Sequence, residues 1–161
     1  MGLRYAYKVS NPRAFGSAFM SLRVKDCMSK AIETVDGSLS VFEASKIMLN
    51  KDVDYLIVIE KAQPAGIITE RDLVLKVMAQ GKSPSKMKIR ECMSTPIITT
   101  DPEASIEEAV RTMAKHGIRR LPVVRDTIIY GVFTSQDLTK NFDKYEGKLA
   151  REIIFSFWKK F

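Results

Sequence analysis

The sequence predicts an α/β fold in which one strand-helix-strand-strand-helix unit occurs twice, with both copies packed as a single pseudo-twofold module. The first observation is an internal repeat: a shift from position 27 to position 92 superimposes Cys27-Met28-Ser29 on Cys92-Met93-Ser94 and, without any gap, Gly66 on Gly131. Such a period indicates one supersecondary unit used twice. A unit of about 60 residues is marginally stable alone, so the copies are expected to share one core. Two like units packed face to face would enclose two like clefts.

The second observation is that short strand-like and helix-like segments alternate, which favours α/β layers over a helical bundle. In the first copy the expected elements are, in order, a strand at 32–35, a helix that begins after Ser40, strands at 55–60 and 66–69, and a helix at 70–79. Ser40 and Glu43 form a capping-box pattern, and Gly81 ends the last helix. A turn is expected at Ala62-Gln63-Pro64.

The second copy predicts the same order: a strand at 97–100, a helix that begins after Ser105 and ends at Gly117, strands at 121–124 and 128–133, and a helix opened by Thr134. Ser105 and Glu108 repeat the capping box. Turns are expected at Asp101-Pro102 and at 125–127. Residues 81–88, which are rich in Lys and Ser, form the expected linker between the copies.

On this basis the chain divides into a basic aromatic N-terminal arm at 1–23, the first repeat at 24–82, the second repeat at 89–144 and a basic amphipathic C-terminal extension at 145–161. The net charge of +7 lies at the termini. Residues 1–23 carry four bases and no acid, and residues 140–161 carry six bases and three acids. Of 26 bases and 19 acids, this leaves 16 of each for the body, which is neutral. The basic character therefore concerns the arms and not the repeats.

Several protein classes are disfavoured by the composition. No apolar run is long enough to span a bilayer, and the start, Met1-Gly2-Leu3-Arg4-Tyr5, lacks the pattern of a signal peptide, so we expect a cytoplasmic protein. With His116 as the single histidine and only Cys27 and Cys92 as thiols, no metal site and no catalytic constellation is predicted, and we do not expect an enzyme. The cysteines are expected to be small, half-buried thiols beside the first strand of each unit; a disulfide across the pseudo-twofold axis is the alternative.

The strongest local motif is Gly66-Ile67-Ile68-Thr69-Glu70-Arg71-Asp72, which occurs again as Gly131-Val132-Phe133-Thr134-Ser135-Gln136-Asp137. The glycine lets another group approach the strand closely. Thr and Asp stand three apart at a helix start, where they can form a cap. The same geometry offers a hydroxyl and free amides to a phosphate, and a carboxylate to the hydroxyls of a ribose. Both interpretations can hold, because a ligand can replace a cap.

The duplicated unit resembles the cystathionine-β-synthase (CBS) domain. The resemblance covers residues 24–140 and is carried by three motifs that occur twice in the same order. In the second repeat these are the segments Cys92-Met93-Ser94-Thr95-Pro96 with Thr99-Thr100, His116 to Val124, and Gly131 to Asp137. The first repeat matches at Met28-Ser29, Thr34-Val35, Val53 to Val58 and Gly66 to Asp72.

This resemblance implies a CBS pair, or Bateman module, which binds adenine nucleotides or S-adenosyl compounds in clefts between its repeats. It implies that Thr69 and Thr134 contact phosphate, that Asp72 and Asp137 hold the ribose, and that Lys30-Ala31-Ile32 and Thr95-Pro96-Ile97 line the adenine pocket. The nucleotide would be a regulatory ligand, and no cofactor would be required. A homodimer formed through the helices is expected, and the module would pass the ligand state to a protein partner that the sequence does not identify.

The repeats differ where Arg119-Arg120 of the second match Asp54-Tyr55 of the first. Guanidinium groups bind phosphate bidentately, whereas a carboxylate repels it. We therefore expect two unequal clefts, of which one binds the charged nucleotide better. The alternative is that Arg119 and Arg120 pair with surface acids.

The C-terminal residues 148–161 are apolar, aromatic and basic together. As a helix, Ile153, Phe157 and Phe161 would share one side. Such a helix is expected to dock on the body or on a second subunit. The alternative function class is an adaptor that binds nucleic acid or an acidic membrane surface through the terminal arms.

Overall fold

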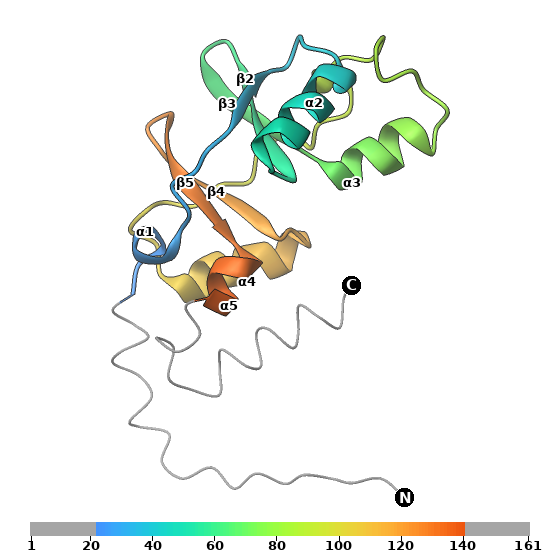
Figure 1. The fold of residues 1–161 in the computed structure, drawn as a ribbon. Coiled ribbons are helices and arrows are strands. Elements are labelled where there is room, and N and C mark those ends of the chain that lie inside the picture. The colour runs from blue at the N-terminus through green and yellow to red at the C-terminus, as the bar shows by residue number, and fades with distance from the viewer. Residues whose placement is uncertain (1–21, 141–161) are drawn as a thin grey trace, which may run out of the picture.

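The computed structural model describes residues 22–140 and shows the α/β fold with two repeats that the sequence predicts (Figure 1). The first repeat contains β1 (Thr34–Asp36), α2 (Val41–Lys51), β2 (Tyr55–Glu60), β3 (Gln63–Thr69), α3 (Glu70–Asp72) and the π-helical continuation η1 (Leu73–Met78). The second contains α4 (Ile106–His116), β4 (Arg120–Arg125), β5 (Ile128–Thr134) and α5 (Ser135–Lys140). A short helix opens each repeat: α1 (Val24–Cys27) in the first and the 3₁₀ turn η2 (Ile89–Glu91) in the second. The expectations for the C-terminal extension, and for nearly all of the N-terminal arm, lie outside the described residues.

Each repeat is built on an antiparallel hairpin, β2 with β3 and β4 with β5. The registers match: Tyr55 pairs with Thr69 and Arg120 pairs with Thr134. The hairpin turns lie at residues 61–62 and 126–127, where both residues of each pair have positive φ. Two left-handed residues suit the twist of a two-residue hairpin loop. The first turn therefore precedes the expected one, and Gln63 and Pro64 belong to β3.

The prediction of a strand at 97–100 is wrong. The corresponding strand of the first repeat, expected at 32–35, does form as β1, which pairs parallel with β2. Only Thr100 makes an isolated parallel bridge, to Val123. In the first repeat the Ile57 amide donates to the Glu33 carbonyl at 3.0 Å. The matching residue is Pro122, which has no N–H to donate, so the ladder loses this bond and shortens.

Helix starts follow the predicted caps. Ser40 and Ser105 accept a hydrogen bond from the Glu43 and Glu108 amides, and each glutamate reaches back to the cap residue. Val41, Ala44 and Met48 of α2 are buried, as are Ile106, Ala109 and Met113 of α4. The 3.6-residue period thus identifies the core-facing side of both helices correctly.

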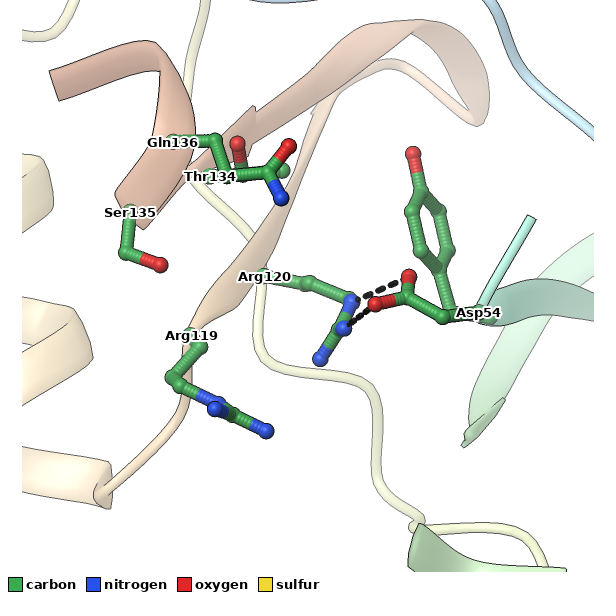
Figure 2. A pocket seen from close by; sticks show the side chains of 7 residues that line it. Asp54, Arg119, Arg120, Thr134, Ser135 and Gln136 are labelled. Atoms are coloured by element: carbon green, nitrogen blue, oxygen red, sulfur yellow. Dashed lines mark hydrogen bonds and ion pairs between the residues drawn. The ribbon is translucent and has the colours of Figure 1, made fainter. Parts of the chain in front are cut away.

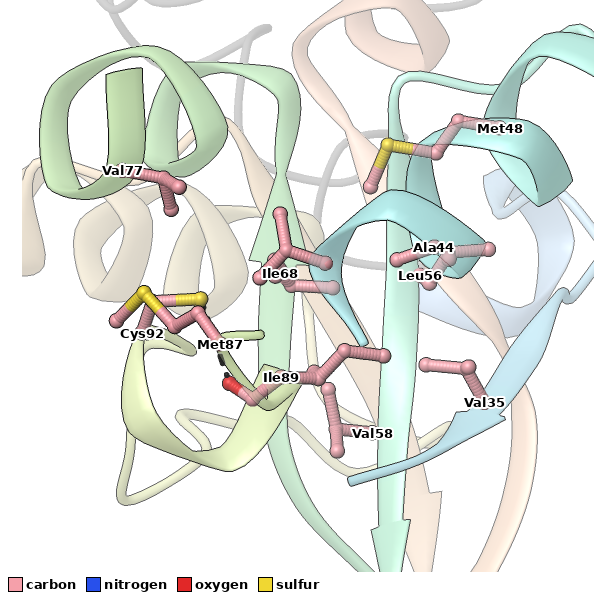
Figure 3. Close-up of a cluster of buried hydrophobic side chains, with 11 residues drawn as sticks. Val35, Ala44, Met48, Leu56, Val58, Ile68, Val77, Met87, Ile89 and Cys92 are labelled. Atoms are coloured by element: carbon pink, nitrogen blue, oxygen red, sulfur yellow. Dashed lines mark hydrogen bonds between the residues drawn. The ribbon is translucent and has the colours of Figure 1, made fainter. Parts of the chain in front are cut away.

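The expectation of one shared core is wrong, because each repeat has its own buried cluster. The two cores are connected because they exchange their leading segments. Val24 and Cys27 of α1, although first in the chain, pack into the core of the second repeat with Ile106, Leu121 and Phe133. Residues Met87, Ile89 and Cys92 around η2 pack into the core of the first repeat (Figure 3). The core of each repeat is therefore incomplete without the opening segment of the other repeat, and this exchange joins the two repeats into one module.

This exchange also decides the state of the thiols. Cys27 and Cys92 are both free and buried, each in a different core. The prediction of free thiols is confirmed and the disulfide alternative is wrong, but the thiols are fully buried and not half-buried. Burial raises the pKa of the Cys92 thiol, which keeps it protonated at neutral pH.

Two glycines make the exchange sterically feasible. Ser29 forms an antiparallel bridge with Val132, and Ser94 forms one with Ile67. A Cβ on Gly131 would lie 2.4 Å from the Ser29 carbonyl oxygen, and one on Gly66 would lie 2.8 Å from that of Ser94. The group that approaches each glycine is thus backbone of the exchanged segment.

Within residues 22–140, none of the helices combines the length and apolar character needed to cross a bilayer.

Candidate functional site

Both Thr–Asp pairs form reciprocal caps. Thr69 donates from its hydroxyl and its amide to Asp72 Oδ2, at 2.7 and 2.9 Å, and the Asp72 amide donates to Thr69 Oγ1 at 3.3 Å. The corresponding distances for Thr134 and Asp137 are 2.7, 2.8 and 3.2 Å. Asp72 and Asp137 are both buried. The capping interpretation of the motif is therefore confirmed.

The neighbouring amides are also engaged, contrary to the expectation of free amides at these helix starts. The Glu70 amide donates to the Asp54 carbonyl at 3.1 Å, and the Ser135 amide donates to the Arg119 carbonyl at 3.0 Å. These two equivalent bonds fix the start of β2 beside Thr69 and the start of β4 beside Thr134. A phosphate at either helix start would have to exchange with bonds of the cap.

An open pocket of about 180 Å³ lies where the two repeats meet (Figure 2). We call it the inter-repeat pocket. It is lined by residues of both repeats: Asp54, Tyr55, Arg119, Arg120, Thr134, Ser135 and Gln136. The structure thus brings together the predicted site residues Thr134, Arg119 and Arg120, and Asp137 adjoins them through its bonds to Thr134.

Arg120 of the second repeat pairs bidentately with Asp54 of the first. Its Nε lies 2.9 Å from Asp54 Oδ1, and Nη2 contacts Oδ2 (Figure 2). The Arg120 side chain is 17% exposed and that of Asp54 is 46% exposed. The prediction that Asp54 and the two arginines belong to different clefts is therefore wrong. The alternative that Arg120 pairs with an acid is confirmed, and the acid belongs to the other repeat.

Tyr55 completes the pocket wall. The Arg120 guanidinium lies 5.5 Å from the centre of the Tyr55 ring, a cation–π distance. Burial raises the pKa of the Tyr55 phenol, and the Asp54 carboxylate raises it further. The phenol therefore stays protonated at neutral pH. With two guanidinium groups and one carboxylate among its lining residues, the pocket carries a net positive charge that suits an anionic group.

The matching region of the first repeat is arranged differently. The Lys76 ammonium lies 2.7 Å from Asp72 Oδ1 and donates to the Cys92 carbonyl at 2.9 Å and to Ser94 Oγ at 3.1 Å. The Ser94 hydroxyl in turn donates to Asp72 Oδ1 at 3.3 Å. We call Thr69, Asp72, Lys76 and Ser94 the first-repeat cluster.

The six residues expected to line an adenine pocket lie elsewhere. Since Ser29 and Ser94 pair antiparallel with Val132 and Ile67, the chain after each serine runs away from Thr134 and Thr69 toward the hairpin turns. Thr95 donates to the Ala65 carbonyl at 3.0 Å. Lys30, Ala31, Thr95 and Pro96 are exposed, and Ile32 and Ile97 are partly buried. None of these six lines the inter-repeat pocket.

Sequence reasoning missed Lys76 and Ser94, and it did not place Tyr55, Ser135 or Gln136 in a pocket. One signal was available for Lys76, because the repeat shift sets it opposite the uncharged Asn141. Within the described range 22–140, no group of three or more His, Cys, Asp and Glu side chains could hold a metal ion.

Comparison with known proteins adds a family and solved relatives. Residues 24–79 and 89–144 match the family model of the CBS domain. The CBS domain-containing protein YhcV of Bacillus subtilis is 35% identical over 118 residues, which cover 73% of this chain and 84% of YhcV. Protein MK0525 of Methanopyrus kandleri is 50% identical over 84 residues, 52% of this chain and 43% of that protein, so less than half of this relative's length is matched.

Two solved structures are similar to this chain over three quarters or more of its length. The hexameric CBS-CP12 protein from bloom-forming cyanobacteria has a TM-score of 0.73 and 33% identity, covering 83% of this chain and 76% of its own. The CBS domain pair of protein MJ0100, solved in complex with 5′-methylthioadenosine and S-adenosyl-L-methionine, has a TM-score of 0.68 and 31% identity. That alignment covers 75% of this chain and 99% of the MJ0100 pair.

Proposed function

Because this chain belongs to the CBS domain family, we propose that it is a regulatory module which binds an adenosine-containing ligand, a nucleotide or an S-adenosyl compound, between its two repeats. The observation that carries the proposal is the inter-repeat pocket, which sets Arg119 and Arg120 beside the capped Thr134. The MJ0100 pair, which binds two adenosyl compounds, supports this ligand class.

The chemistry of the side chains in and beside the pocket suggests a role for each of them. The guanidinium of Arg120 binds an acidic group of the ligand, a phosphate or a carboxylate. The Tyr55 ring offers an apolar surface against which a flat or apolar part of the ligand packs. Asp137 accepts from ribose hydroxyls in exchange for part of its bonding to Thr134. Asp54 opposes excess negative charge, so the pocket favours one acidic group over a polyphosphate.

The pocket also provides a route from binding to a change of state. A ligand acts on a protein only through different affinities for two of its states. The Arg120–Asp54 pair connects the repeats, and an anionic ligand competes with Asp54 for the same guanidinium. Occupancy therefore exchanges an inter-repeat contact for a ligand contact, which alters how firmly the repeats are held together. A protein partner that senses this contact would read the ligand state.

We further propose that the module forms a homodimer through the helices of its first repeat. Large apolar side chains are exposed on α2 and η1: Phe42, Leu49, Val74, Leu75 and Met78. The second repeat has Glu107, Ala114, Thr139, Lys140 and Asp143 at the matching positions. Within residues 22–140, only the helices of the first repeat expose large apolar side chains, whereas in the second repeat these lie on β5 (Ile128 and Tyr130). Exposed apolar surface of this kind on helices is typical of an interaction site. The hexameric state of the cyanobacterial CBS-CP12 protein supports the proposal that this module self-associates.

Two predictions from the sequence have not been tested. The first is that the protein binds its ligand without converting it, and is therefore not an enzyme. The second is that the basic arms act as an adaptor toward nucleic acid or an acidic surface. Incubation with AMP or ATP tests the first, and product formation would count against it. Binding to DNA or RNA that weakens steeply with salt, and that is lost when residues 151–161 are deleted, would support the second.

The proposed ligand class is tested by a thermal-shift screen with AMP, ATP and S-adenosylmethionine. A ligand that binds only the folded state raises the melting temperature as its concentration exceeds the dissociation constant. The shift should be lost or strongly reduced in Arg120→Gln and Asp137→Asn. Glu108→Gln is the matched control, because Glu108 caps α4 as Asp137 caps α5 but does not line the pocket. A shift that persists in both pocket variants would place the ligand elsewhere.

A further inference from the structure

In the first repeat the Lys76 ammonium pairs with Asp72, the carboxylate that the family resemblance assigns to a ribose. Asp72 Oδ2 accepts from the hydroxyl and amide of Thr69, and Oδ1 accepts from the Lys76 ammonium and the Ser94 hydroxyl. Both oxygens of the carboxylate are therefore engaged by the protein. The three donors of an ammonium are matched by Asp72 Oδ1, the Cys92 carbonyl and Ser94 Oγ.

This contact set is built rather than incidental. Asp72 is buried, with a side chain that is 11% exposed. Lys76 lies one turn further along the same helical segment. Cys92 and Ser94 belong to the segment that the second repeat sends across to β3, where Ser94 exchanges two backbone hydrogen bonds with Ile67 at 2.8 and 3.1 Å. Lys76 thus connects its own helix to the exchanged segment beside Asp72.

We infer that Lys76 closes the first-repeat cluster to the ligand, so that the inter-repeat pocket at Thr134 is the working site and the chain binds one ligand. This inference rests on the proposed function. A ribose approaching Asp72 would have to replace an ion pair, in which both partners are charged, with hydrogen bonds from neutral hydroxyls. Lys76 is thus the residue that sets the number of ligands per chain.

The two repeats differ in sequence at the position of Lys76, the residue that we infer closes the first-repeat cluster. The residue that matches Lys76 in the second repeat is Asn141, which carries no charge. The serines that lead into the repeats also differ in their bonding. Ser94 Oγ donates to Asp72, whereas Ser29 Oγ accepts from the Ala31 amide at 3.3 Å. The lysine closure is accordingly a feature of the first repeat.

The removal of Lys76 should have opposite effects on ligand binding if the lysine closes the site and if it binds a phosphate. If Lys76 were a phosphate ligand of an open first site, its removal would weaken binding. If it closes the site, its removal frees Asp72 and Ser94 and adds a binding site. Lys76→Met keeps most of the length of the side chain and removes the charge, so it separates the two outcomes.

The test is titration calorimetry on the full chain with AMP, ATP and S-adenosylmethionine in turn. We expect one ligand per chain for the wild type and two for Lys76→Met, with the second lost again in Lys76→Met/Asp72→Asn. Lys25→Met is the matched control and should still bind one, since Lys25 also pairs with a carboxylate at 2.7 Å, that of Glu103, but outside the cluster.

Two ligands on the wild type, or one or none on a folded Lys76→Met, would overturn the inference and leave the proposed function standing. Binding of no probe to any variant would overturn both. If Lys76→Met does not fold, the number of ligands bound by the wild type still tests the inference. Reductive methylation of Lys76, followed by mass spectrometry with Lys46 as reference, should be unaffected by saturating ligand. A changed reactivity would show that ligand enters the cluster.

Discussion

Asp54 of the first repeat and Arg120 of the second form a bidentate ion pair across the module, with Nε 2.9 Å from Oδ1. The two residues stand at nearly equivalent positions of their repeats, so the pair lies where the pseudo-twofold copies face each other. Under the proposed function, it is the contact through which a ligand at Arg120 would affect how the two repeats are held together.

Replacement of Asp54 by Asn should tighten the binding of AMP. The change removes a negative charge from the pocket and frees the Arg120 guanidinium for the phosphate. At a partly exposed site such a charge is worth about 1 kcal/mol, or roughly fivefold in affinity. Calorimetry should show this gain for AMP and none for adenosine, which lacks the phosphate. Asp126→Asn, in the distant hairpin turn, should change neither. Equal gains for AMP and adenosine would argue against competition between Asp54 and the phosphate.

Gly131→Ala should destabilise the fold, because the new methyl group would meet the Ser29 carbonyl at 2.4 Å. A backbone atom held in a bridge cannot move cheaply, and overpacking of this kind costs about 1–3 kcal/mol in the free energy of unfolding. Gly66→Ala should act in the same direction through Ser94. In Gly37→Ala the near atom is Oε1 of Glu60, the end of a flexible side chain, so the cost should be smaller. Urea unfolding measures all three, and an equal loss in Gly37→Ala would contradict the explanation.

Asp101 should titrate well below an ordinary aspartate. Hydrogen bonds from the Arg125 guanidinium, whose Nε lies 2.9 Å from Oδ2, lower the pKa of Asp101 from 3.8 to about 2, with help from the Glu103 amide. A pKa depressed in the folded state means that the unfolded chain takes up the proton first. The stability that this pair contributes is therefore complete above pH 3.8 and is lost as the pH falls through about 2.

The measurement is an NMR titration of the Asp101 carboxyl carbon in the wild type and in Arg125→Gln. The pKa should rise toward 3.8 in the variant. The acid-unfolding midpoint of the variant should move to higher pH. A pKa near 3.8 in the wild type would show that the pair does not hold in solution.

The apolar surface of α2 and η1 should mediate self-association. Leu49 is 80% exposed and Val74 is 51% exposed. Glutamate at these positions would place charges in an apolar contact, so Leu49→Glu/Val74→Glu should be monomeric by light scattering where the wild type is dimeric. Thr139→Glu is the control, because Thr139 matches Val74 in the second repeat and is exposed. Dissociation by Thr139→Glu alone would move the interface to the second repeat.

Local features of the fold could be predicted from the sequence. The Ser40–Glu43 cap and the Thr69–Asp72 cap join residues three apart, and the side-chain types alone specify them. The loss of a strand at 97–100 could not be predicted, although Pro122 was visible. Its missing N–H matters only because Thr100 pairs parallel beside it, and that pairing is tertiary.

The candidate site depends still more on tertiary structure. Asp54 and Arg120 are 66 positions apart, and their contact follows from how the repeats face each other. The exchange of α1 and η2 between the cores carries Ser94 to Asp72, which no local pattern specifies. Aligning the two repeats therefore identifies Asp54 and Arg120 as residues that differ between the repeats, but it cannot predict that the two side chains meet in one pocket.

The most direct test of the central claim is a crystal structure of the full chain with whichever of AMP, ATP or S-adenosylmethionine gives the largest thermal shift. Our account predicts electron density for that ligand in the inter-repeat pocket, with its acidic group on Arg120 and its ribose at Asp137. Density for the ligand on another surface, with the Arg120–Asp54 pair intact and the pocket holding only solvent, would contradict it.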